Sequence, residues 1–127
     1  NETRYFIKHP GPVREFVNWV LERKISWFAI DASSMDHPMN TVIRKVRPDL
    51  ALKCAQKLGK PLEEIWPDDD LQLMHYDMFP HGVFHVENAG GMIDEVLNQR
   101  MWIGCFPWKF NGGEAAFCRL VAFVDKG

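Results

Sequence analysis

A helical pattern is followed at once by a strand pattern in residues 13–30, VREFVNWVLERKISWFAI. Apolar residues recur at i, i+3, i+4, i+7 and i+8 across residues 13–21, which predicts a helix with one buried stripe. Pro12 suits the first helical position. Residues 25–30 are β-branched, aromatic and nearly uncharged, as in a strand buried on both faces of a parallel or mixed sheet. A helix followed by a strand favours an α/β layer architecture.

The middle of the chain predicts further helices. Residues 48–58 carry apolar positions at helical spacing and are followed by Gly59, which suits the left-handed residue that ends many helices. In this helix Cys54 is expected to be a small buried hydrophobic residue. Residues 61–67 are typical of a short helical turn between prolines. The acidic run at residues 68–70 suits the N-terminal end of the next helix. That helix would present on one face Leu71, Met74, His75 and Met78.

The last third predicts a hairpin. Residues 101–124 are rich in aromatic and β-branched side chains and are interrupted by Asn-Gly-Gly at residues 111–113. If the first two of these form a two-residue turn, Cys105 lies opposite Cys118. The two thiols would then be neighbours in a reducing compartment and a disulfide only under oxidation. Pro107 indicates that its strand is bulged or at an edge.

Composition and charge exclude several classes of protein. The 127 residues include 15 basic and 17 acidic side chains, giving a net charge of -2, so we expect no nucleic-acid partner and no membrane association. No apolar run approaches the roughly 20 residues that span a bilayer. The length predicts a single domain, residues 1–127. Three widely spaced cysteines argue against a disulfide framework or a zinc knuckle and favour a cytoplasmic location.

His75 and Glu87 are the sharpest pair of candidate metal ligands. His75 lies on the apolar face of its predicted helix, and Glu87 ends the apolar strand predicted at residues 83–86, so each is expected to need a partner. Imidazole and carboxylate are both good ligands for zinc or manganese. A buried hydrogen bond between the two is the alternative. His81 and His85 enlarge the cluster, and His85 shares strand parity with Glu87, which suits a role in orienting a ligand.

The polar loop after residue 30 is a second candidate region. It leaves the C-terminal end of the predicted buried strand, where α/β proteins usually place their sites. Asp31 and Asp36 in this loop could contact a substrate or orient a metal ligand. The alternative is that these side chains satisfy nearby backbone groups in local turns.

Four segments, taken in order, resemble the C-terminal half of the cyclase family of metal-dependent hydrolases, which includes kynurenine formamidase and isatin hydrolase. The resemblance covers most of the chain and lies in His9-Pro10-Gly11, residues 29–36, the run from His75 to Glu87-Asn88, and residues 103–110 with Cys118-Arg119.

This resemblance implies a function and a fold. In the family a His is followed twelve residues later by Glu-Asn, and both bind metal, which here designates His75 and Glu87. It implies hydrolysis of an amide, lactam or ester by a water activated on zinc or manganese. The implied fold is the C-terminal portion of an α/β domain with a compact, mixed, barrel-like β core of the swivelling β/β/α type and flanking helices. Family members usually assemble into dimers or tetramers, so a homo-oligomer is expected.

One family motif is missing from the chain. The remaining ligands and the catalytic His belong to a His-x3-His-x-Asp-x-Pro-x-His type run, which does not occur here. We therefore expect the catalytic base and the other ligands to come from an N-terminal half in the parent chain or from a partner. The chain begins at Asn1 rather than Met, which processing, cloning or a larger parent would each explain. The alternative is a catalytically incomplete or degenerate homologue that acts as a structural or oligomerisation module.

Overall fold

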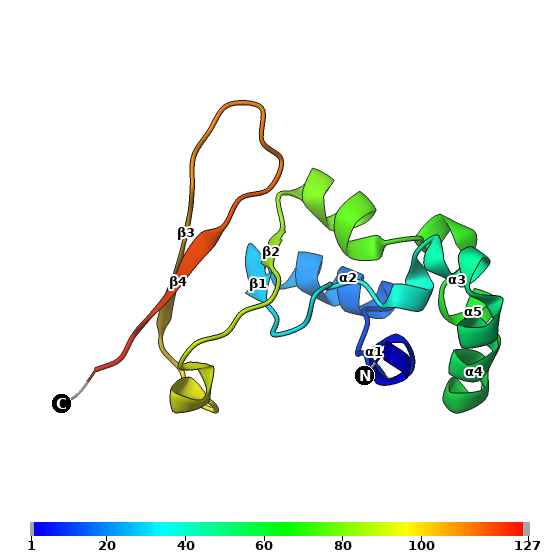
Figure 1. Ribbon diagram of the computed structural model, residues 1–127. Coiled ribbons are helices and arrows are strands. Elements are labelled where there is room, and N and C mark those ends of the chain that lie inside the picture. Colours follow the sequence, from blue (N-terminus) through cyan, green and yellow to red (C-terminus); the bar gives the residue numbers. More distant parts are fainter. Residues whose placement is uncertain (1, 126–127) are drawn as a thin grey trace. The chain divides into compact units, whose positions relative to one another are not determined.

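The computed structural model describes residues 2–125. The chain divides into two compact units, Asn1–Asn88 and Ala89–Gly127, and each is described separately. The first unit combines helices with a small parallel sheet, and the second is built on an antiparallel hairpin (Figure 1). Mixed helix and sheet agree with the α/β class predicted from the sequence. Neither two-stranded sheet closes into a barrel within the described residues, so the barrel-like core stays a prediction.

The first unit begins with helices α1 (Glu2–Lys8) and α2 (Arg14–Glu22). Helix α2 confirms the predicted stripe, since Val17 and Val20 are fully buried. It starts two residues later than expected from Pro12. The carbonyl oxygen of Pro12 accepts a hydrogen bond from the indole nitrogen of Trp66 at 2.8 Å, and Val13 is extended with ψ 168°. Pro12 is therefore held outside the helix.

Strand β1 (Trp27–Ala29) pairs in parallel with β2 (Phe84–Val86) over the full length of both strands. The parallel pairing was predicted for this segment, but burial on both faces was wrong. Trp27 and Phe28 are half-buried and Ala29 is exposed. Among the described residues β1 pairs with β2 alone, so this two-stranded sheet is small and its other edge carries no strand.

The segment between the two strands is helical. It contains α3 (Ile43–Val46), α4 (Pro48–Leu58) and α5 (Leu62–Ile65), with short 3-10 turns at Pro38–Asn40 and Asp68–Asp70. Helix α4 matches its predicted bounds and ends at Gly59, whose φ of 72° is left-handed, as expected. Cys54 is fully buried, again as predicted.

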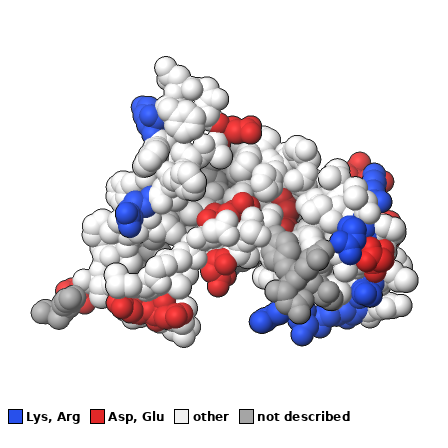
Figure 2. Space-filling view, viewed as in Figure 1, with Lys and Arg blue, Asp and Glu red and all other residues white. Residues whose placement is uncertain are grey.

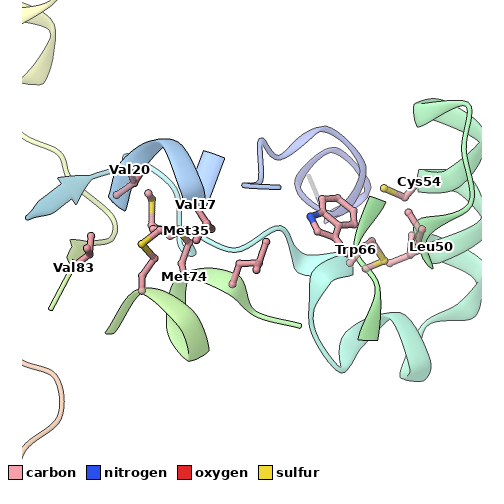
Figure 3. Packing of buried hydrophobic residues seen from close by; sticks show 12 residues of the cluster. Val17, Val20, Met35, Leu50, Cys54, Trp66, Met74 and Val83 are labelled. Carbon is pink, nitrogen blue, oxygen red and sulfur yellow. The ribbon is translucent and has the colours of Figure 1, made fainter. Parts of the chain in front are cut away.

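The core of the first unit is continuous from α2 to α4. Figure 3 shows Val17, Val20, Met35 and Met74 together between α2 and the helical segment that precedes β2. In the same view Trp66 lies near Leu50 and Cys54 of α4. This packing holds the loop after β1 in place, because Met35 and Met39 of that loop belong to the core.

The second unit contains a 3-10 turn (Ile93–Val96) and strands β3 (Trp102–Pro107) and β4 (Cys118–Phe123). The strands form the predicted hairpin, but the predicted register was wrong. Cys105 pairs with Leu120, and Cys118 pairs with Pro107. The loop is residues 108–117, closed by a hydrogen bond from the Trp108 amide to the Phe117 carbonyl at 3.0 Å.

The predicted turn residues lie inside this loop instead of joining the strands directly. The ring of Phe110 lies so close to Gly113 that a Cβ there would be 2.0 Å from Cε2 of the ring. Phe110 therefore packs on Gly113 within the loop. Asn111 and Gly112 still turn the chain, with φ 76° at Gly112, but inside this longer loop. Cys105 and Cys118 are diagonal neighbours on one face and are free thiols.

Charge and helix length add two observations. On the face shown in Figure 2, Lys and Arg lie in separate groups interspersed with Asp and Glu, consistent with the near balance of 15 basic and 17 acidic residues. No helix in residues 2–125 combines the length and apolar character needed to cross a bilayer.

Candidate metal centre

Three side chains with metal-binding atoms meet beside the parallel strands of the first unit. His85 is the middle residue of β2, Glu87 directly follows that strand, and His75 belongs to the π-helix η3 (Met74–Met78). One donor atom from each residue lies within 4.8 Å of the other two. The cluster is the one group of three or more His, Cys, Asp or Glu with such spacing in the part of the chain that the structure describes.

The backbone around η3 explains how His75 reaches the strand. After the 3-10 turn η4 (Phe79–His81), Gly82 adopts φ 73°, and the amide of Val83 donates to the carbonyl of Met78 at 3.1 Å. This left-handed residue turns the chain directly into β2. The predicted helical segment and the predicted strand at residues 83–86 are therefore both present, although the helical segment is a π-helix, a form that often occurs at functional sites.

An ion-pair network holds η3 to α2. Arg14 donates from Nε to Oδ1 of Asp70 at 3.0 Å and forms short ion pairs with the carboxylates of Asp70 and Asp77. These pairs raise the pKa of Arg14, the hydrogen bond to Asp70 being the largest cause. On the other side of the π-helix, Met74 and Met78 are fully buried. His75 is thus carried by a segment fixed by packing and by charge.

The geometry within the cluster is close. His85 and Glu87 lie on the same side of the chain, as strand alternation requires, with 3.2 Å between His85 Nε2 and Glu87 Oε1. The rings of His75 and His85 meet edge to face, with centroids 4.8 Å apart, and Phe79 stacks on His85. The side chain of His85 is only 5% exposed, against 32% for His75 and 28% for Glu87. His85 therefore forms the buried end of the cluster.

A fourth residue, Asp36, binds the cluster from the loop after β1. Its Oδ2 lies 2.7 Å from Nδ1 of His75, and its Oδ1 accepts the backbone N–H of Met74 at 3.1 Å. Asp36 is completely buried. The neighbouring backbone N–H of Met35 donates to Oε1 of Glu87 at 2.9 Å. Two adjacent loop residues thus contact two members of the cluster.

The two histidines have opposite pKa shifts. The hydrogen bond to Asp36 raises the pKa of His75 above its ordinary value of 6.5, against the opposing effect of burial. Burial lowers the pKa of His85, and the charge of Glu87 offsets part of that effect. His85 is therefore biased toward the neutral imidazole that binds metal ions.

Two residues predicted near the site lie outside the cluster. His81 is 54% exposed, and its Nδ1 donates to the carbonyl of Asp77 at 2.8 Å. Asp31 is exposed at the start of its loop. His85, expected from parity to orient a ligand, instead stands in the group of donor atoms. The contact of the Met35 amide was not anticipated, because no side-chain pattern reveals which backbone N–H a folded loop will point at a carboxylate.

The donor set fits a divalent transition metal. Two imidazoles and one carboxylate are ligands that zinc and manganese accept. Nδ1 of His85 is buried and has no hydrogen-bond partner among the described residues, which is unfavourable for a polar atom.

Comparisons of the chain with protein-family models, with characterised proteins and with solved structures give no match. The resemblance to the cyclase family, and the activity and fold that it implies, therefore stay predictions.

Proposed function

We propose that this chain forms part of a metal-dependent hydrolase of the cyclase family that acts on an amide, lactam or ester. The observation that carries the proposal is the cluster of His75, His85 and Glu87, whose donor atoms lie within 4.8 Å of one another. When bound, zinc or manganese supplies a Lewis acid for a carbonyl oxygen and activates a water as nucleophile.

The partial exposure of the cluster favours a catalytic metal ion over a purely structural one. The two ligands from outside the strand, His75 and Glu87, are each about one-third exposed, at 32% and 28%. A small substrate could therefore approach from their side, while His85 and the stacked Phe79 close the opposite end.

The proposal assigns three metal ligands to this chain and assigns the base and the remaining ligands to another segment. The chain lacks the His-x3-His-x-Asp run that supplies the base and remaining ligands in the family it resembles. We propose that an N-terminal segment or a partner subunit supplies them, and that the family's barrel-like core and homo-oligomer form in that assembly. The isolated 127 residues should then hydrolyse N-formylkynurenine or isatin negligibly.

Metal content is the direct test. After equilibration with zinc or manganese and removal of free ion, elemental analysis should find the metal in the wild type and its loss in His75→Ala and Glu87→Ala. His81→Ala is the matched control, because it removes a nearby histidine that lies outside the cluster, and it should retain the metal. Full occupancy in both ligand variants would refute the metal centre.

Activity is tested in a protein that also carries an upstream His-x3-His-x-Asp run. Such a protein should hydrolyse an aryl formamide or a lactam and lose turnover in Glu87→Gln, which keeps an oxygen to accept the Met35 amide. If it binds metal but shows no turnover on any amide, lactam or ester, the hydrolase assignment is wrong and the non-catalytic alternative is correct.

A further inference from the structure

The loop between β1 and the first 3-10 turn contacts two of the three proposed ligands through neighbouring residues. Asp36 reaches His75, and the backbone of Met35 reaches Glu87, at 2.7 Å and 2.9 Å. His75 and Glu87 come from different elements, and the sequence separations of these contacts are 39 and 52 residues. One short loop therefore connects the helical and the strand side of the cluster.

The chemistry of Asp36 determines which nitrogen of His75 carries a proton. A carboxylate accepts hydrogen bonds, and here one oxygen accepts from the amide of Met74 while the other lies against Nδ1 of His75. Nδ1 must then be the donor, which leaves the lone pair of the neutral ring on Nε2. Complete burial of Asp36 keeps water from competing for either bond.

The amide of Met35 acts on the carboxylate of Glu87. A backbone N–H at 2.9 Å fixes the rotation of that side chain and occupies one lone pair of Oε1. The loop can serve as a fixed support because it is packed into the core: Met35 is 8% exposed, and Met39 is fully buried. His37 also caps the following 3-10 turn by accepting the Met39 amide.

We propose that Met35 and Asp36 form a positioning clip, which sets the tautomer of His75 and the orientation of Glu87 before a metal binds. The clip rests on the proposed metal centre for its purpose, but its contacts involve the chain's own residues alone. Asp36 is thus a positioning residue that acts through His75, as carboxylates commonly do behind metal-binding histidines.

Asp36→Asn tests the clip with little change of shape. The single amide oxygen can face the Met74 amide or Nδ1 of His75 but not both. Where it faces Met74, the amide NH2 faces Nδ1 and favours a His75 ring whose proton is on Nε2. We expect zinc affinity, measured by competition with a chromogenic chelator, to fall about 10–100-fold. Asp69→Asn is the charge-matched control, since Asp69 is exposed, and it should retain wild-type affinity.

A second readout needs no metal, and its first measurement uses the wild type alone. Nitrogen NMR of the metal-free wild type, in alkaline buffer where the ring is neutral, should show His75 with its proton on Nδ1. In Asp36→Asn, if circular dichroism shows a native fold, the same ring should become a mixture of tautomers. Exchange of the Met35 amide should also be slow in the wild type and faster in metal-free Glu87→Ala.

The outcomes separate the clip from the metal centre. If the wild type binds no zinc, the proposed function fails whatever the tautomer of His75. If the wild type binds zinc and natively folded Asp36→Asn binds it equally well, or if His75 of the wild type carries its proton on Nε2, the clip is refuted while the metal centre stands.

Discussion

The buried His37 should make this protein lose stability in mild acid. Its ring is 3% exposed, stacks on Trp66 with centroids 4.7 Å apart, and accepts the backbone N–H of Met39 on Nδ1 at 2.9 Å. Burial, aided by the nearby His9, lowers the pKa of His37 from 6.5 to about 4. Protonation would also destroy the acceptor at Nδ1, so the folded state disfavours the charged ring for a second reason.

The sign and the size follow from linkage. The unfolded chain takes up a proton near pH 6.5 and the folded chain only near pH 4, so between these values the unfolded state binds more protons. The contribution of neutral His37 to the free energy of unfolding is fully present above pH 6.5 and is lost as the pH falls from 6.5 to 4. The full loss is about 3 kcal/mol, because one pKa unit is worth about 1.4 kcal/mol. Between pH 7.5 and pH 5 the expected loss from His37 is about 2 kcal/mol.

His37→Asn isolates this contribution. Asparagine keeps an oxygen that can cap the Met39 amide, as short polar side chains do at helix starts, but it does not titrate. Urea unfolding followed by circular dichroism, with chelator present, gives the free energy of unfolding of both proteins at pH 7.5 and pH 5. The variant will be less stable at pH 7.5, since a smaller side chain leaves a cavity. Its loss on acidification should be smaller than the wild type's by about 2 kcal/mol. Equal losses in both proteins would refute the reasoning.

Three further changes test packing and backbone geometry. Gly59→Ala should lower the free energy of unfolding by about 1 kcal/mol, because the φ of 72° at this position is left-handed and disfavours a residue with a Cβ. No steric clash adds to this cost, since the new Cβ meets nothing within 4 Å. Gly11→Ala should lower it more, by about 3 kcal/mol, because its Cβ would lie 2.2 Å from that of His37. Met39→Ala removes a fully buried side chain and should cost about 3 kcal/mol in the same urea assay. Ellman's reagent should not reach Cys54 until the protein unfolds, because the thiol is fully buried and burial raises its pKa.

Helices α2 and α4 were predictable because their information is local. The apolar stripe of α2 and the stop at Gly59 are set by residues within a few turns of one another. The hairpin register was not predicted, because Asn111 and Gly112 lie inside a loop of residues 108–117 instead of joining the strands as a two-residue turn. Local pattern thus predicted these elements but not the length of the loop that sets their alignment.

The candidate site was likewise predictable only in part. The spacing of His75 and Glu87 and the alternation of the strand anticipated that these residues and His85 would converge. The contact of Asp36 with His75 spans 39 residues and depends on how the core places the intervening loop. The sequence therefore suggested Asp36 as a candidate, but its bond to Nδ1 required the folded chain.

A crystal structure of the protein grown with zinc, with anomalous data collected at the zinc absorption edge, tests the central claim most directly. The account predicts an anomalous peak among His75, His85 and Glu87, at about 2.0–2.2 Å from one donor atom of each. In that structure Asp36 should still contact Nδ1 of His75. A map with no peak among these three residues, although zinc is present in the crystal, would contradict the account.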